Sequence, residues 1–310
     1  MEGYGVTSIA ATGIVFIILG LFDLLQKKNR KHFFNLLLIV QLYFDLFLNA
    51  MYLIKSVLTH FLALPMEYFS FNHLFVCPAL RFSLVCSILM TVVLTYSRVR
   101  AVEKPFQQRT LGESQTDKIK HLAKNVIPVI LASIALTIPW FFEYKVSIGT
   151  TTSSGTPILL ASSIRQNPIY VIGVIGVFSL LILGIVPNIV LIVFSCRIYK
   201  AVKRSSLLQI DANKCSQSFN TKTPRWEIVL VIAMLFLVSS IPRILLTGLE
   251  ITIQFLTLFK SETLQQIMCY IPYYSTLLNN TNKLVTVLNS SMHIFMYKGI
   301  SKFKSKITNV

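Results

Sequence analysis

Ionisable side chains that interrupt long apolar stretches are the residues of this sequence best placed to do chemistry. Asp45 lies near the middle of one such stretch, and three cations and two acids lie in or beside others. The cations are Arg81, Arg243 and Lys283, and the acids are Glu143 and Glu250. A charge placed in hydrocarbon is costly, so we expect each of these groups to meet an opposite charge, a carbonyl, water or a ligand.

Three cations against two acids would make a net positive site wherever the fold brings these residues together. An anionic or carbonyl-rich ligand group would balance this charge, and nearby aromatic residues would provide apolar walls. These aromatic residues are Phe141, Phe142, Tyr270, Tyr273 and Tyr274. A second interpretation stays open, in which Glu143 and Glu250 neutralise two of the cations while Lys283 extends towards water. All five charged residues are candidate ligand-binding residues.

The composition indicates which elements position these residues. Hydrophobic residues make up 54% of the 310 residues and charged residues only 13%, whereas a soluble protein carries roughly 25% charged residues. Seven stretches of the chain are as long and apolar as a membrane-spanning helix, which needs about 20 residues. They cover residues 6–26, 33–55, 71–97, 122–142, 169–196, 226–255 and 270–297. The sequence predicts an all-α membrane protein, with residues 1–310 forming a single seven-transmembrane helix bundle.

The distribution of basic residues predicts the orientation of the bundle. Most of the 29 lysine and arginine residues lie between spans 1 and 2, 3 and 4, and 5 and 6, or in the C-terminal tail. Basic segments stay on the cytoplasmic side, so the N-terminus lies outside and the C-terminus inside. In the tail, a helix over residues 299–308 would carry Ile300, Phe303 and Ile307 on one face. This pattern predicts a short amphipathic helix on the inner surface of the lipid bilayer.

The sequence offers little support for other classes of function. The basic residues form short islands between apolar stretches, a distribution that does not favour nucleic acid as a partner. No metal-ligand spacing, phosphate-binding loop or nucleophile triad occurs in the chain. We therefore expect neither an enzyme nor a cofactor.

Several short motifs resemble those of rhodopsin-like (class A) G-protein-coupled receptors. Residues 97–105 read SRVRAVEKP, which is similar to the D-R-Y-x-A-V-x-x-P signature at the cytoplasmic end of the third span. Asp45 follows Asn35 by ten residues, as in the second span of that family. Residues 240–242 (SIP) resemble its W-x-P motif, and residues 289–297 (NSSMHIFMY) resemble its N-S-S-x-N-P-x-x-Y motif.

Two further motifs resemble invertebrate FMRFamide-type peptide receptors, of which this chain would be a divergent member. Residues 139–144 read PWFFEY, similar to P-R-F-F-E-Y, and residues 242–250 read PRILLTGLE, similar to P-R-x-x-L-x-x-x-E. The resemblance covers spans 2 to 7. It implies a plasma-membrane receptor that transmits the binding of an extracellular neuropeptide to a heterotrimeric G protein.

The resemblance also implies roles for individual residues. Arg98 would contact an inserted helix of the G protein, and Asp45 would help to hold a sodium ion. A water-mediated polar network around Asp45, without sodium, stays open because His293 replaces an amide or acid of the family. Kinks at two prolines would let spans 5 and 6 move, and two residues of span 7 would take part in activation. The prolines are Pro187 and Pro242, and the span-7 residues are Asn289 and Tyr297.

Other positions depart from the family pattern. Ser97 replaces the acid that restrains the neighbouring arginine, which implies high basal signalling. Ser240 replaces the tryptophan of span 6, and both cysteines of the extracellular disulfide are missing, with His73 at one position. Three functions therefore stay open. They are a peptide receptor, a chemosensory receptor for a small molecule, and a seven-span transporter that does not couple to G proteins.

Overall fold

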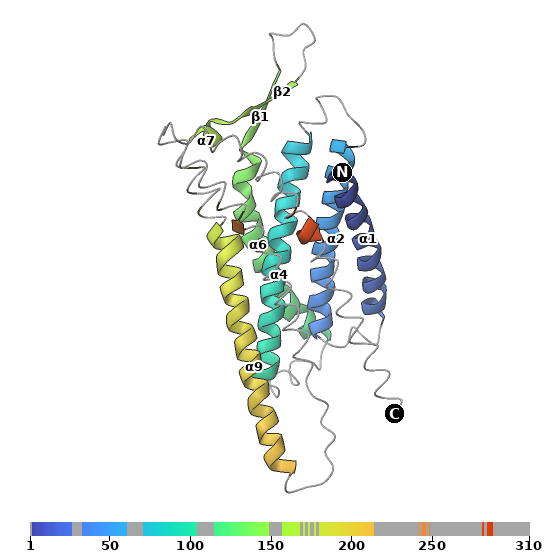
Figure 1. The fold of residues 1–310 in the computed structure, drawn as a ribbon, viewed down its shortest axis with the longest axis vertical. Helices are drawn as coiled ribbons and strands as arrows, with labels where there is room; N and C mark the ends of the chain where they lie inside the picture. Colours follow the sequence, from blue (N-terminus) through green and yellow to red (C-terminus); the bar gives the residue numbers. More distant parts are fainter. Residues whose placement is uncertain are drawn as a thin grey trace.

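The protein folds as a bundle of long helices with one short β-hairpin at one end (Figure 1). The computed structural model describes most of the chain up to residue 213 and a few positions beyond it. The described ranges are 2–26, 33–60, 71–103, 115–148, 157–167 and 180–213, with residues 170, 173, 177, 241, 244, 245, 248, 281 and 284–287. The side chains of the hairpin lie outside this description.

Five of the described helices are long and apolar enough to cross a membrane. They are α1 (Glu2–Leu25), α2 (Phe33–His60), α4 (Cys77–Glu103), α6 (Gln115–Phe141) and α9 (Val186–Asn213). Short π-helical segments, η1 (Asn72–Val76) and η3 (Leu180–Ile185), lead directly into α4 and α9. The helical prediction is confirmed for the first five spans. The last two spans, apart from a few helical positions such as Ile244 and Val287, lie outside the described residues, as does the tail helix predicted over 299–308.

The observed helices run past the apolar segments from which they were predicted. The segment predicted over 122–142 is α6, which begins at Gln115 and carries Asp117 in its first turn. An acidic side chain in the first turn is stabilised by the partial positive charge at the N-terminus of a helix. α9 likewise continues to Asn213, although its apolar part ends at Ala201. Both helices therefore extend beyond the apolar segments that hydropathy identifies.

The bundle buries polar side chains and exposes large apolar ones, the reverse of a water-soluble protein. Phe22 on α1 is 70% exposed, and Leu131 on α6 is 61% exposed. By contrast Asp45 and Ser133 are fully buried. Polar side chains inside a helical bundle and apolar ones outside fit a hydrocarbon surrounding, where only a polar interior offers hydrogen-bond partners. The arrangement is that of a multi-pass membrane protein.

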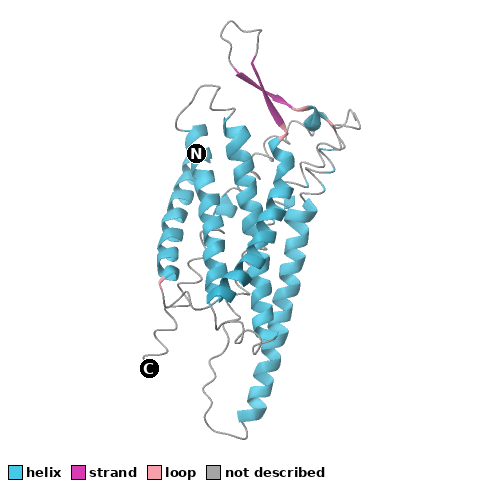
Figure 2. Cartoon of the chain, turned by 180° about the vertical axis from the view of Figure 1, so that it is seen from behind, coloured by secondary structure: helices cyan, strands magenta, loops and turns pink. Residues whose placement is uncertain are grey.

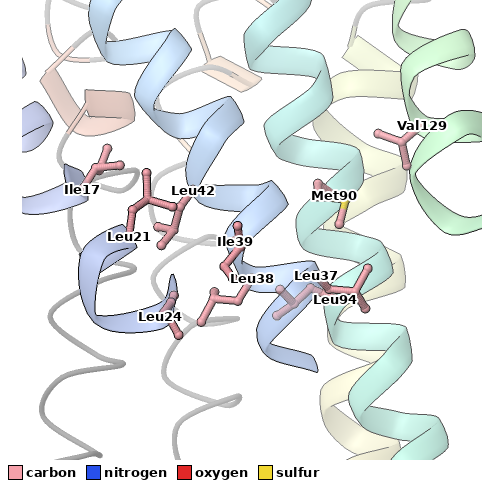
Figure 3. Packing of buried hydrophobic residues seen from close by; sticks show 10 residues of the cluster. All are labelled: Ile17, Leu21, Leu24, Leu37, Leu38, Ile39, Leu42, Met90, Leu94 and Val129. Atoms are coloured by element: carbon pink, nitrogen blue, oxygen red, sulfur yellow. The ribbon is translucent and has the colours of Figure 1, made fainter. Parts of the chain in front are cut away.

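Apolar side chains from four helices form the largest core cluster (Figure 3). Ile17 and Leu21 of α1 lie against Leu42 of α2, and the cluster continues through Met90 of α4 to Val129 of α6. A second cluster lies towards the other end of α2, where Leu48 packs with neighbours from three further segments. These neighbours are Ala10, Tyr52, Leu80 and Val287. The two clusters fix the packing of α1, α2 and α4.

The start of α9 is an irregular point in the backbone. Pro187 is the second residue of α9 and follows the π-helical segment η3 directly. Proline has no N–H to donate, so the i−4 hydrogen bond of a regular helix is lost there. The side-chain amide of Asn188 donates to the carbonyl of Gly184 at 2.7 Å and so satisfies one backbone acceptor. The change from π-helical to α-helical backbone marks this position in span 5, and the kink expected at Pro187 stays a prediction.

The hairpin was not anticipated from the sequence. Strand β1 (Tyr144–Ile148) pairs with the antiparallel strand β2 (Pro157–Ala161), with Tyr144 opposite Ala161 (Figure 2). It follows α6 almost immediately, and the backbone N–H of Ser162 donates to the carbonyl of Glu143 at 2.8 Å. This bond closes the base of the hairpin against the end of α6. Each strand has only five residues, and so short an alternation of side chains did not reveal the pairing in the sequence.

Replacing Gly184 with valine should destabilise the bundle by about 1–3 kcal/mol, because overpacking forces neighbouring side chains to shift. A Cβ atom at Gly184 would lie 3.2 Å from Cγ1 of Ile244. Thermal unfolding of the purified chain in detergent measures the effect. Gly173→Val is the matched control, since a Cβ there meets nothing within 4 Å. Equal melting temperatures for the two variants would contradict the close approach of η3 to Ile244.

Candidate functional site

The carboxylate of Asp45 lies fully buried between α2 and α4. The hydroxyl of Ser87 donates to its Oδ1 atom at 2.6 Å. The side-chain amide nitrogen of Gln41 lies 3.2 Å from both carboxylate oxygens and 3.0 Å from the Ser87 hydroxyl. These three side chains, the Asp45 cluster, therefore share one connected set of hydrogen bonds. Hydrogen bonds to an ionised group are stronger than neutral ones, so the cluster holds the two helices firmly together.

Helix periodicity brings the members of the Asp45 cluster together. Gln41 and Asp45 are four residues apart on α2 and therefore lie on the same face of that helix. On α4, hydroxyl residues recur every fourth position from Ser83 to Thr95. The Thr91 and Thr95 hydroxyls donate to carbonyls of their own helix, each at 2.8 Å. The Ser87 hydroxyl instead donates across the interface to Asp45, so this one position links the helices.

The groups around Asp45 show whether a sodium ion fits the expected site. Sodium would need oxygen ligands converging on one point, but the Gln41 amide nitrogen lies at that point. With the amide in this orientation the residues do not fit a sodium ion. Ser290 and His293, the span-7 positions of that network, lie outside the described residues. Within the described part of the chain, no group of three or more His, Cys, Asp or Glu residues could hold a metal ion.

Arg98 lies near the end of α4 that is opposite the hairpin, where it is half-buried. Its guanidinium carbon is 3.2 Å from the centre of the Phe34 ring at the start of α2. A cation over an aromatic face is attracted by the electron-rich ring, by about 0.5–2 kcal/mol. Since Ser97 supplies no acid beside Arg98, the aromatic contact provides a restraint of a different kind.

The hairpin end of the bundle contains two of the predicted ligand-binding residues. Arg81 is exposed on α4, and its guanidinium carbon is 4.5 Å from the centre of the Trp140 ring of α6. Glu143, just after α6, is only 4% exposed. Trp140 is 8% exposed, and its indole N–H is buried with no hydrogen-bond acceptor among the described residues. Among these residues it is therefore an aromatic ring, rather than a carboxylate, that lies against Arg81.

The predicted site residues fall into separate groups. Asp45 is in the middle of α2, Arg81 and Glu143 are near the hairpin, Arg98 is at the other end of α4, and Pro187 is at the start of α9. The remaining predicted positions lie outside the described residues, so their contribution to ligand binding or activation stays a prediction. They are Pro242, Arg243, Glu250, Lys283, Asn289 and Tyr297.

Sequence reasoning missed four residues that touch the predicted ones. Gln41 could have been found from its spacing, since a polar residue four positions before a buried acid lies on the same helix face. No such spacing in the sequence points to Ser87, Phe34 or Trp140. Each contacts its partner from a different helix, so only the packing of the helices reveals the pair.

Comparison with known proteins gives no independent assignment. No family model matches the chain, and no curated protein matches it.

Replacing Ser87 with alanine should lower the free energy of unfolding by about 1.5–3 kcal/mol, because a hydrogen bond to a buried charge is lost. Ser83→Ala is the matched control on the same helix. Ser83 is buried as well, but its hydroxyl donates to the Leu80 carbonyl one turn away, so its loss should cost less than about 1 kcal/mol. Thermal unfolding in detergent compares the two variants. A loss from Ser83→Ala as large as that from Ser87→Ala would contradict the special role of the Asp45 contact.

Proposed function

We propose that this chain is a G-protein-coupled receptor of the rhodopsin-like kind, with seven spans in the plasma membrane. It binds an extracellular ligand, a neuropeptide of the FMRFamide type, at the hairpin end. It activates a heterotrimeric G protein at the Arg98 end. The N-terminus is outside the cell and the C-terminus is cytoplasmic.

The observation that carries this proposal is the placement of three functional positions along a single helix. α4 carries Arg81 near the hairpin, Ser87 in the Asp45 cluster and Arg98 near its other end. Arg81 and Arg98 are seventeen residues apart, or about 26 Å at 1.5 Å per residue. That distance is close to the roughly 30 Å thickness of the hydrocarbon core. A ligand that moves α4 at one surface would therefore act directly on Arg98 at the other.

The hairpin end offers groups that suit a peptide. Arg81 is exposed and held over Trp140, so it can meet a carboxylate or carbonyl of the ligand without first breaking an ion pair to a described residue. The Trp140 N–H, buried without an acceptor among the described residues, becomes a second donor when the ligand displaces the side chains that cover it. Main-chain carbonyls are abundant in a peptide, and each can accept from either donor. The hairpin, attached to α6 through Glu143 and Ser162, lies at this end of the bundle (Figures 1 and 2).

The opposite end offers a long helix beyond the membrane-spanning part. α9 continues from Ala201 to Asn213, about 18 Å of helix. It extends farther than its described neighbours (Figure 1). The sequence at the start of this extension includes Lys203 and Arg204, and Lys200 directly precedes it. Basic residues suit an acidic protein partner, and together with Arg98 they support assignment of this end to G-protein coupling.

Basal nucleotide exchange on G proteins tests the signalling half of the proposal. Basal exchange should be higher in cells that express the chain than in mock-transfected cells, because Ser97 replaces the acid that restrains this arginine in the resembled family. Phe34→Leu should raise the output about two- to tenfold, since the aromatic restraint on Arg98 is removed. Arg98→Leu should reduce it to the mock level. Arg100→Gln, an exposed arginine on the same helix, is the control and should change little.

All variants are compared at equal, measured surface expression. Absence of exchange on every G-protein class, both without ligand and across a screen of amidated peptides and small organic acids, would contradict the receptor assignment. Solute flux in the same cells would then favour the transporter.

Agonist potency tests the ligand half of the proposal. Once the screen yields an agonist, Arg81→Gln should raise its half-maximal concentration at least tenfold, which corresponds to about 1.4 kcal/mol. Trp140→Phe keeps the ring beneath Arg81 but removes the N–H donor, and should cause a smaller loss. Lys55→Gln, a partly buried lysine on α2, is the control. Unchanged potency in both Arg81→Gln and Trp140→Phe would place the ligand elsewhere.

A further inference from the structure

The amide nitrogen of Gln41 lies at the point where three oxygen atoms converge. Two belong to the Asp45 carboxylate, each 3.2 Å away, and the third is the Ser87 hydroxyl oxygen at 3.0 Å. This is the kind of position a bound cation would take among oxygen ligands. We propose that the Gln41 amide replaces a cation at Asp45, so that the native bundle is stable without a bound sodium ion.

The orientation of the amide follows from its surroundings. A side-chain amide carries two N–H donors on nitrogen and only acceptor capacity on oxygen. With nitrogen facing Asp45, its partial positive charge meets the carboxylate and the Ser87 oxygen. With Oε1 in that place, a partially negative oxygen would face the ionised carboxylate at the same distance. The electrostatic repulsion would be severe in a site where Gln41 is 2% exposed and Asp45 is fully buried.

A sodium ion would require the reverse orientation. An ion between Asp45 and Ser87 would attract the oxygen of Gln41 and repel its N–H groups, so the amide would have to rotate. The ion would also have to displace the Gln41 nitrogen, whose three contacts with oxygen would be lost. Binding of the ion and the present position of the amide therefore exclude each other.

The geometry also explains why the amide suffices without a full positive charge. Ser87 donates the shortest bond, 2.6 Å, to Oδ1, and Gln41 bridges Oδ1 and Oδ2. Short hydrogen bonds to an ionised group strengthen as the local dielectric falls. The cluster joins two helices at mid-bundle, so stability that would otherwise depend on an ion depends on a covalently attached group. The Gln41 amide is present at the site whatever the ion content of the medium.

Thermal unfolding of the full-length chain in detergent tests the proposal without any assumption about signalling. Melting temperatures are compared in sodium chloride and in choline chloride at the same concentration, about 150 mM. The melting temperature of the native chain should differ by less than about 1 °C between the two salts. Gln41→Met keeps a similar volume but removes the donor, and its melting temperature should be at least about 3 °C higher in sodium chloride, through linkage to ion binding.

Two further variants locate the effect. Adding Asp45→Asn to Gln41→Met removes the charge that attracts the ion, so the sodium effect should disappear. Thr95→Val removes another buried hydroxyl of α4, one that donates to the Thr91 carbonyl of its own helix, and should show no sodium effect. If Gln41→Met yields no folded protein, Gln41→Asn takes its place, since the shorter amide withdraws from the carboxylate and should leave room for the ion.

Two outcomes would overturn the proposal. Stabilisation of the native chain by sodium as large as that of Gln41→Met would show that the amide rotates and its oxygen binds the ion. Absence of a sodium effect in Gln41→Met, or in Gln41→Asn where that variant takes its place, would show that the carboxylate has no need of a cation-like neighbour. Both outcomes are independent of whether the chain activates a G protein.

Discussion

The buried carboxylate of Asp45 is the constraint on which the packing of the bundle depends. A charge inside a helical bundle is tolerated only when donors surround it. Here the donors come from two helices, because Gln41 lies one turn away on α2 and Ser87 faces it from α4. A shift of either helix by one turn would move Ser87 away from Asp45. The polar contact therefore fixes the register of α2 against α4 more sharply than apolar packing, which tolerates small displacements.

The apolar clusters lie on either side of this polar layer. One cluster includes Leu42, just before Asp45 on α2, and continues through Leu94 towards the Arg98 end. The other includes Leu48, just after Asp45, and Leu80 towards the hairpin. Packing density holds the helices close in both clusters, while the intervening polar groups specify which faces meet. Many large side chains on the outside of the bundle are again apolar.

Three contacts join elements of the bundle at different depths. A backbone bond between Ser162 and Glu143 closes the hairpin against the end of α6. The Gln41 amide lies against Asp45 in the middle of the bundle, and the Phe34 ring lies against Arg98 at the end opposite the hairpin. Under the proposed function, these contacts lie along the route between the ligand and the G protein.

The sequence alone determined the membrane environment and the first five helices, because apolar stretches of sufficient length must form helices in hydrocarbon. It also singled out Asp45, Arg81 and Arg98, since an ionisable residue within such a stretch is conspicuous whatever the fold. Only the tertiary structure decided what these residues touch. Ser87 is forty-two positions from Asp45 in the chain, and Phe34 and Trp140 look like ordinary lipid-facing or core residues. Contacts between helices depend on the rotation of each helix about its axis. That rotation is set by the packing of all the helices together, so no single stretch of sequence specifies it.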